Sequence, residues 1–150
     1  MLHLNRTDSD DKDFVALVRQ LDADLARRDG AEHAFYNQFN KIDKIRHAVV
    51  AYEAGQPLGC GAIKELEPGT TEIKRMYTVP ASRGKGIATQ ILTALETWAT
   101  ELGYNICKLE TGKRQPEAIR VYEQNGYQTI PNYGQYAGIE NSVCFEKKLS

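Results

Sequence analysis

A glycine-rich turn is the feature of this sequence best suited to binding a charged ligand. It joins a predicted strand to a predicted amphipathic helix. Closely spaced glycines let a backbone turn tightly and bring its N–H groups near a ligand. The helix start adds unpaired N–H donors and a partial positive charge, which favour a pyrophosphate, and cationic side chains in the turn would strengthen its binding. The turn and the first helical residues are Arg83, Gly84, Lys85, Gly86, Ile87, Ala88 and Thr89.

The turn departs from two common nucleotide-binding patterns. A P-loop has a serine or threonine directly after its lysine, whereas Gly86 follows Lys85 here. A dinucleotide-binding loop has a third glycine, and Thr89 stands at that position. The sequence therefore argues against both patterns. On the glycines alone, an ordinary strand-to-helix loop explains the turn as well as an anion site does.

A second motif, one helix and one strand further along, favours the anion site over the ordinary loop. Residues 118–127 (AIRVYEQNGY) hold an alanine, a tyrosine four residues later, and then a glycine–aromatic pair. Residues 83–88 supply arginine, glycine and alanine at the spacing R-x-x-G-x-A. In this order the two motifs closely resemble the GNAT superfamily, the N-acetyltransferases that use acetyl-coenzyme A. The resemblance covers residues 71–127, and the rest of the chain follows it only in the order of its elements.

The resemblance implies a site for acetyl-coenzyme A as cosubstrate, with no metal. In the family, the strand before the turn carries a bulge, which splays the neighbouring strands to admit the coenzyme. The backbone N–H of Met76 would then bind the thioester carbonyl, and the backbone of Thr78 would line the pantetheine arm. Gln115 stands where the family often has an asparagine that contacts this arm. The expected coenzyme-binding residues are Met76, Tyr77, Thr78, Arg83, Gly84, Lys85, Gly86, Ile87, Ala88, Thr89, Gln115 and Tyr122.

Acetyl transfer to an amine poses two protonation problems. An alkyl amine with a lysine-like pKa of about 10 is mostly protonated near neutral pH and must lose a proton before it attacks. The departing thiolate must gain a proton or be stabilised. The resemblance implies that Tyr122 is the general acid and that Glu72, on the strand before the turn, is the base. From the residues alone, Tyr122 could also pack in a helix core, and Glu72 could pair on the surface with Lys74 or Arg75.

The amine acceptor is expected to contact two regions of the chain, residues 30–40 and residues 131–141. Aromatic side chains in both regions could form a wall around the acceptor, and a glutamate on the strand after the helix could hold a cationic amine. Half-packed loop aromatics and a surface charge explain the same residues equally well. The candidate acceptor residues are Tyr36, Phe39, Glu110, Tyr133 and Tyr136.

These residues need a scaffold that alternates between strands and helices. Apolar residues at helical spacing and alternating runs bounded by glycine and proline define its elements. Strand alternation would place Glu72, Lys74, Met76 and Thr78 on one face unless a bulge intervenes. Helices are predicted over residues 14–28, 31–44, 88–102 and 116–125, and strands over residues 2–6, 46–52, 58–66, 71–79, 105–111, 127–130 and 142–149.

The order of the elements predicts a mixed α/β fold. Three consecutive strands favour an antiparallel meander, and the strand–helix–strand–helix–strand order over residues 71–130 predicts right-handed crossovers and a locally parallel pair of strands. With the resemblance, this becomes a twisted, mostly antiparallel sheet with one splayed parallel pair and about four flanking helices. The 150 residues, of which 41% are hydrophobic and 26% charged, suit one domain over residues 1–150.

Net charge and the spacing of the cysteines limit the kinds of partner, metal site and cellular compartment that the sequence predicts. The formal net charge of −1 offers no basic surface for nucleic acid, and no apolar run approaches the roughly 20 residues of a membrane helix. Cys60, Cys107 and Cys144 form no CxxC pair, which disfavours disulfides and zinc sites and favours a reduced, cytoplasmic protein. The last strands, if exposed, would allow a homodimer.

The predicted function is that of an acyltransferase. It would move an acetyl group from acetyl-coenzyme A to a primary amine of a small molecule or amino acid, by direct attack. Transfer through an acetyl-cysteine is disfavoured because no cysteine has a paired base in the sequence. Two alternatives stay open: acetylation of a protein or peptide, and a non-catalytic module that binds or senses acyl-coenzyme A.

Overall fold

A seven-stranded mixed sheet forms the centre of the molecule, whose computed structural model describes residues 1–30 and 45–149. The strands are β1 (Leu2–Thr7), β2 (His47–Glu53), β3 (Gln56–Glu67), β4 (Thr70–Thr78), β5 (Ile106–Gly112), β6 (Gln128–Ile130) and β7 (Ser142–Lys148). They lie in the order β1-β2-β3-β4-β5-β7-β6, and all described pairings are antiparallel except that of β4 with β5. The predicted mixed, mostly antiparallel sheet is confirmed.

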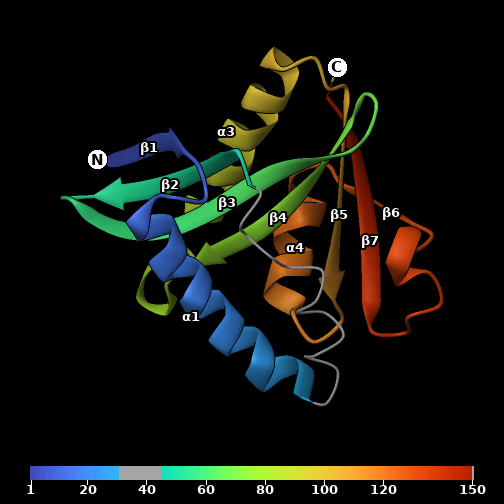
Figure 1. Cartoon of the computed structure of the whole chain (residues 1–150). Coiled ribbons are helices and arrows are strands. Elements are labelled where there is room, and N and C mark those ends of the chain that lie inside the picture. Colours follow the sequence, from blue (N-terminus) through green and yellow to red (C-terminus); the bar gives the residue numbers. More distant parts are fainter. Residues whose placement is uncertain (31–44, 150) are drawn as a thin grey trace.

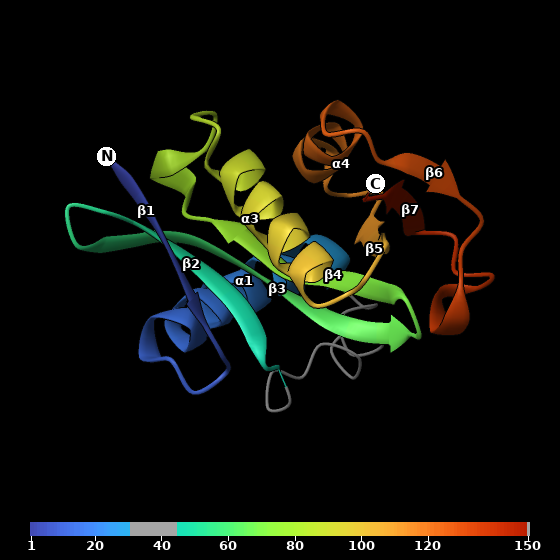
Figure 2. The ribbon, with the colours of Figure 1, turned by 90° about the horizontal axis from the view of Figure 1, so that it is seen from above.

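Three α-helices lie among the described residues and cover both faces of the sheet. They are α1 (Lys12–Asp29), α3 (Ile87–Glu101) and α4 (Pro116–Gln124), and η2 (Pro80–Ser82) and η3 (Gly134–Tyr136) are short 3₁₀ turns. Helix α1 packs on one face of the sheet, and α3 and α4 lie on the other (Figure 2). The helix predicted over residues 31–44 lies outside the described residues.

Apolar spacing along the two long helices explains how they pack. In α1, Phe14, Leu17, Val18 and Leu21 recur at intervals of three and four residues and are buried against β2 and β3. In α3, residues 87–99 repeat the same spacing and are buried against the opposite face. The sheet is therefore covered by apolar side chains on both faces, and its strands are held at fixed positions relative to the helices.

The parallel pairing of β4 with β5 is short. Residues 70–72 pair with residues 106–108, and beyond them the two strands diverge towards their carboxyl ends (Figure 1). The crossover helix α3 joins the strands, as a parallel pair requires. Because the described pairing stops after three residues, the facing backbone edges border a cleft.

A bulge in β4 lies where this cleft opens. Arg75 and Met76 together face the single residue Gly61 of β3, and Arg75 has a φ of 60°, in a region that few residues other than glycine adopt. The bulge breaks the alternation of side chains along the strand. Lys74 and Arg75 therefore lie on the α1 side of the sheet with Glu72, whereas Met76 lies on the α3 side. Simple alternation would have kept Glu72 and Met76 on one face.

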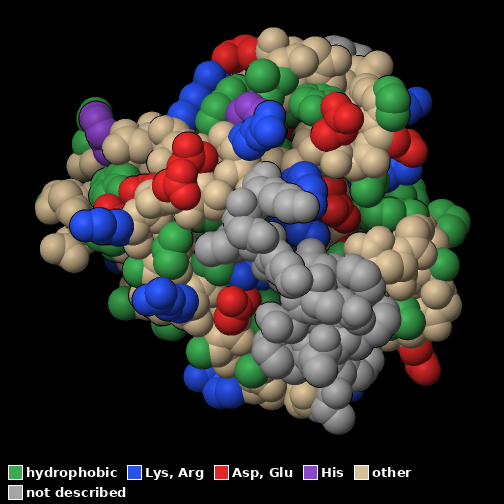
Figure 3. Space-filling view, in the orientation of Figure 1, with side chains coloured by type: hydrophobic (Ala, Val, Ile, Leu, Met, Phe, Trp, Pro, Cys, Tyr) green, Lys and Arg blue, Asp and Glu red, His purple; other side chains and the backbone are tan. Residues whose placement is uncertain are grey.

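The surface carries both signs of charge. On the face shown in Figure 3, acidic and basic side chains are interspersed rather than gathered into one large basic area. Within the described residues, no helix is both long and apolar enough to cross a membrane.

Close packing of α3 against β3 gives a stability prediction. A Cβ at Gly59 would lie 2.8 Å from the Tyr77 backbone oxygen and 3.0 Å from Ile91 Cδ1. Because the Tyr77 oxygen belongs to a paired strand, we expect Gly59→Ala to lower the free energy of unfolding by about 1–3 kcal/mol. Gly61→Ala is the matched control, since the three atoms nearest to its Cβ belong to side chains, and the nearest of them is the sulfur of the flexible Met76. Urea titration of both variants tests this, and an equal or smaller loss in Gly59→Ala would contradict it.

Candidate active site

A groove of about 400 Å³ runs from the end of β4, past the start of α3, along one side of α4. Many of the residues that line it come from the glycine turn and the two predicted motifs. The described lining residues are Leu21, Asp24, Arg28, Met76, Tyr77, Thr78, Ser82, Arg83, Gly84, Gly86, Ile87, Ala88, Thr89, Gln115, Glu117, Ala118, Arg120, Val121, Tyr122 and Gln124. Lys85 is exposed and lies outside this lining.

The glycine turn presents backbone to the groove. Gly84 and Gly86 have φ values of 81° and 80°, and a Cβ added to either would meet nothing within 4 Å. Gly86 is the N-cap of α3, and no described side chain caps the first turn of that helix. The free N–H groups of this turn and the partial positive charge of the helix therefore face open space, which suits an anion.

Arg83 is held against the end of β4. Its Nε donates to the Thr78 carbonyl oxygen at 2.8 Å, and its guanidinium carbon lies 5.5 Å from the centre of the Tyr77 ring. These contacts keep a positive charge beside the glycine turn. A pyrophosphate bound there would meet both backbone donors and a cation.

Helix α4 forms the opposite side of the groove and is fixed at both ends. Near its carboxyl end, Asn125 Nδ2 donates to Thr89 Oγ1 of α3 at 3.1 Å. At its start, Glu117 forms an ion pair with Arg28 of α1, and Arg28 also donates to the Arg114 carbonyl oxygen. The groove thus has walls from three helices whose relative positions are set by specific polar contacts.

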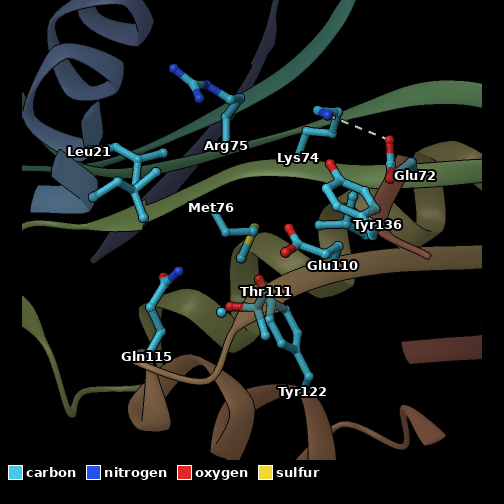
Figure 4. A pocket seen from close by; sticks show the side chains of 13 residues that line it. Leu21, Glu72, Lys74, Arg75, Met76, Glu110, Thr111, Gln115, Tyr122 and Tyr136 are labelled. Atoms are coloured by element: carbon cyan, nitrogen blue, oxygen red, sulfur yellow. Dashed lines mark ion pairs between the residues drawn. The ribbon is translucent and has the colours of Figure 1, made fainter. Parts of the chain in front are cut away.

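A second cavity, of about 90 Å³, adjoins the groove on the α1 side of the diverging strands. The two spaces share Leu21, Met76, Gln115 and Tyr122, so they meet between β4 and α4. Figure 4 shows the side chains that converge there. The described residues that line this second cavity are Leu21, Leu25, Glu72, Ile73, Lys74, Arg75, Met76, Glu110, Thr111, Gly112, Gln115, Tyr122 and Tyr136.

Tyr122 lies at the junction of the two cavities. Its ring packs against Tyr127 and Phe145, with ring centres 5.9 Å and 6.1 Å away, and only 7% of the residue is exposed. Burial and the nearby Glu110 carboxylate raise the pKa of Tyr122 above its usual value. Its hydroxyl therefore stays protonated at neutral pH and can donate a proton or hydrogen bond into the junction.

The Glu72 side chain is buried, and each of its two carboxylate oxygens lies near a neighbouring side chain. The Tyr133 hydroxyl donates to Glu72 Oε2 at 2.6 Å, and Lys74 Nζ lies 3.6 Å from Glu72 Oε1. Burial and the Glu72 carboxylate raise the pKa of Tyr133, so Tyr133 remains a donor. The structure thus brings together two predicted site residues, Glu72 and Tyr133. It also shows the pairing with Lys74 that the sequence left open as an alternative.

Glu110 reaches the cavity from β5, across the cleft from β4 (Figure 4). Its Oε2 accepts a hydrogen bond from Ser142 Oγ at 2.7 Å. Tyr136 lies beside it, 3% exposed, and burial and Glu110 raise the pKa of Tyr136. Tyr136 also packs edge-on against Tyr133. Tyr133 and Tyr136 therefore pack together, and of the two only Tyr136 is among the described lining residues of the cavity, whereas Tyr36 and Phe39 lie outside the described residues.

Arg75 is a cavity residue that the sequence did not single out. Its side chain is 2% exposed, and its Nη2 donates to Asp22 Oδ1 of α1 at 2.7 Å. Its Nε has no hydrogen-bond partner among the described residues. A buried donor without a partner costs about 1–3 kcal/mol. The sequence signal was weak, because only the position of the bulge places Arg75 beside Lys74 and directs both to one face.

Three further lining residues also escaped sequence reasoning. Leu21 and Leu25 read as core positions of an amphipathic helix, and Arg28 as the basic end of that helix. The helical spacing signalled burial, but it carried no information on which sheet region α1 would cover. Among the described residues, no group of three or more His, Cys, Asp or Glu side chains could hold a metal ion.

Comparison with known proteins agrees with this geometry. Residues 15–127 match the model of the acetyltransferase (GNAT) family. The chain is 38% identical over 114 residues to the uncharacterized N-acetyltransferase YsnE of Bacillus subtilis, which covers 72% of this chain and 76% of that protein. It is 33% identical over 138 residues to an IAA acetyltransferase of Azospirillum brasilense, with 90% of both chains covered.

Solved structures show the same fold. A Klebsiella pneumoniae protein provisionally named an acyl-CoA N-acyltransferase superposes with a TM-score of 0.84 at 31% identity, over 100% of this chain and 99% of that one. The PaiA N-acetyltransferase of Thermoplasma acidophilum, solved with coenzyme A, gives a TM-score of 0.73 at 16% identity, with 99% of each chain covered. The second likeness supports the fold alone.

The three cysteines give a prediction about reactivity. Burial raises the pKa of the Cys60 and Cys107 thiols to about 12, and that of Cys144 to about 11. A thiol with a raised pKa carries almost no reactive thiolate near pH 8. We expect iodoacetamide to label the native chain slowly at that pH and all three cysteines after denaturation, as read by mass spectrometry. Rapid native labelling of Cys144 would contradict a packing role.

Proposed function

The chain belongs to the GNAT acetyltransferase family, and on this premise we propose that it acetylates a primary amine of a small molecule by direct transfer from acetyl-coenzyme A. The observation that carries the proposal is the meeting of the two cavities at Met76 and Tyr122. One cavity has the helix N-terminus and glycine turn that suit a pyrophosphate. The other, which we call the acceptor cavity, holds the buried Glu72 carboxylate and the half-buried Glu110 carboxylate, which suit an amine.

The groove residues have separate binding roles. The backbone of Gly84, Gly86 and the first turn of α3 would hold the pyrophosphate, with Arg83 adding charge. The backbone of β4 from Met76 to Thr78 would pair with the pantetheine arm where β5 has diverged. Gln115, which lines both cavities, is placed to offer its amide to the same arm. These assignments locate the thioester near Met76, whose backbone N–H would bind its carbonyl oxygen.

The reaction then needs one attack and two proton movements. The amine nitrogen forms a bond to the thioester carbonyl carbon, and the carbon–sulfur bond breaks in the collapse of the resulting tetrahedral centre. The amine loses a proton to a base on the cavity side, and the sulfur leaves as a thiolate that a donor in the groove stabilises and protonates. A backbone donor near the oxyanion lowers the barrier further.

Tyr122 suits the role of donor to the sulfur. It lines both cavities, and its raised pKa keeps the hydroxyl protonated before the reaction. Glu72 suits the role of base, because it is a buried carboxylate that lines the acceptor cavity. The Tyr133 hydroxyl fixes its orientation, and Lys74 compensates its charge. Because Glu72 and Met76 lie on opposite sides of β4, a water molecule would carry the proton between amine and carboxylate.

The small volume of the acceptor cavity, about 90 Å³, favours a small amine over a protein side chain presented by a large surface. Its described lining comes from α1, β4, β5, α4 and the turn η3, together with Gln115 just before α4. A module that only senses acyl-coenzyme A would have no need of the buried Glu72 carboxylate and the half-buried Glu110 carboxylate beside the thioester site. Turnover with any amine separates the catalytic proposal from that alternative.

Replacing Tyr122 tests the donor role. We expect Tyr122→Phe to lower kcat by roughly 100-fold, because the leaving thiolate loses its donor, while the affinity for acetyl-coenzyme A stays nearly unchanged. Tyr127→Phe is the matched control: it removes a buried hydroxyl that bonds Glu96 outside both cavities, and it should keep kcat. An unchanged kcat in Tyr122→Phe would reject the assignment.

Replacing Glu72 tests the base. A base that already carries a proton cannot accept another, so the wild-type rate should fall as the pH decreases. We expect Glu72→Gln to remove this acidic limb from the pH profile of kcat/KM and to lower the plateau rate by roughly 100-fold. Glu110→Gln is measured alongside, because Glu110 lines the same cavity. Loss of the limb in Glu110→Gln alone would transfer the role to Glu110.

A further inference from the structure

The bulge of β4 places two cations on the wall of the acceptor cavity, and the transfer chemistry uses neither of them directly. Lys74 and Arg75 are consecutive, and both side chains rise from the same side of β4, opposite to Met76 (Figure 4). Both are nearly buried, with side chains 9% and 2% exposed. Buried cations are rare unless they are paired or bind a ligand.

Arg75 has hydrogen-bonding capacity that its described neighbours leave unused. Its Nη2 is paired with Asp22, which neutralises its charge, but its Nε has no partner among the described residues. A guanidinium offers donors in a fixed planar arrangement that matches carboxylate oxygens. Arg75 lines the cavity, and its Nε is a buried donor to which no described residue offers an acceptor.

The charges around the cavity favour a zwitterion. Lys74 and Arg75 lie on one side of it, and Glu110 lies across the cleft on β5 (Figure 4). Lys74 is paired with Glu72 and Arg75 with Asp22, so both cations already have a carboxylate partner. An acceptor with both an ammonium and a carboxylate could place its ammonium near Glu110 and its carboxylate near the unused Nε donor of Arg75.

We propose that Arg75 binds a carboxylate of the acceptor through its Nε, with Lys74 beside it, so that the substrates are amino acids rather than amines in general. The inference rests on the proposed function and narrows it to one substrate class. The carboxylate lies towards the β4 bulge, and the amine lies towards Glu110 and the junction at Tyr122. The bulge therefore serves two purposes, because it opens the strand for the thioester and directs Arg75 into the acceptor cavity.

A paired acceptor series on the wild-type enzyme tests the substrate class. Leucine, phenylalanine, glutamate and γ-aminobutyrate are compared with their primary amides and with the matching amines that lack the carboxyl group. We expect kcat/KM to favour the acids in at least one set by roughly 10- to 100-fold, the value of a hydrogen bond between charged groups. The ammonium of an α-amino amide is more acidic than that of the amino acid. At a given pH a larger fraction of the amide is unprotonated and able to attack. A higher kcat/KM for the acid would therefore have to come from binding of its carboxylate.

Two variants assign the preference to Arg75. Arg75→Lys keeps a positive charge near Asp22 but lacks the Nε donor, and Arg75→Gln removes the charge as well. Both should raise KM for the acid by roughly 10-fold or more and leave kcat/KM for the carboxyl-free amine within about threefold. Asp22→Asn is the control, because it removes the negative charge that faces Nη2 and leaves Nε in place, and it should keep the acid preference.

The outcomes separate the two proposals. Amines acetylated without preference for a carboxylate would overturn the inference and leave the acetyltransferase proposal standing. An acid preference that survives in Arg75→Lys and Arg75→Gln would also overturn it, by placing the carboxylate elsewhere. Failure to acetylate any amine, despite binding of acetyl-coenzyme A, would overturn the proposed function itself. If the Arg75 variants do not fold, the wild-type series still decides the substrate class.

Discussion

The site depends on the early end of one strand pairing. Strands β4 and β5 pair over three residues each and then diverge, and the bulge at Arg75 and Met76 lies just past that point. A continued parallel ladder would satisfy the backbone groups of both strands and fill the space between them. Because it stops, β4 offers backbone to a ligand that can act as an additional strand. Helices α1 and α3 are buried against opposite faces of the sheet and so border the cleft from both sides.

The two cavities differ in what they offer, and their difference defines the chemistry. The groove has helix-terminal and glycine N–H groups with a cation beside them, which suits phosphates. The acceptor cavity has one buried and one half-buried carboxylate, two cations and tyrosines whose raised pKa values keep them as donors. Charges act strongly on one another in such buried surroundings. Tyr122 lines both cavities, so its side chain borders the phosphate-binding groove and the acceptor cavity at once.

Sequence reasoning recovered the features that local patterns encode. The glycine turn, the helix spacing and the order of the strands predicted the fold class, and the resemblance to the GNAT superfamily assigned Arg83 and Tyr122 to one site; both residues line the groove. It did not recover features that depend on distant contacts. The partner of Glu72 is Tyr133, 61 residues away along the chain, and no local pattern joins them. The face to which Arg75 points depends on one extra residue in β4, and alternation alone predicts the opposite arrangement for Met76.

The most direct test of this account is calorimetric titration of the protein with acetyl-coenzyme A, with free coenzyme A and ATP as comparison ligands. ATP carries the adenosine and phosphates but lacks the pantetheine arm. The account predicts binding of both coenzymes at roughly micromolar dissociation constants, and no measurable binding of ATP at the same concentrations. Equal binding of ATP would mean that the cleft between β4 and β5 does not hold the pantetheine arm. Absence of coenzyme binding would reduce the glycine turn to an ordinary loop and contradict the account as a whole.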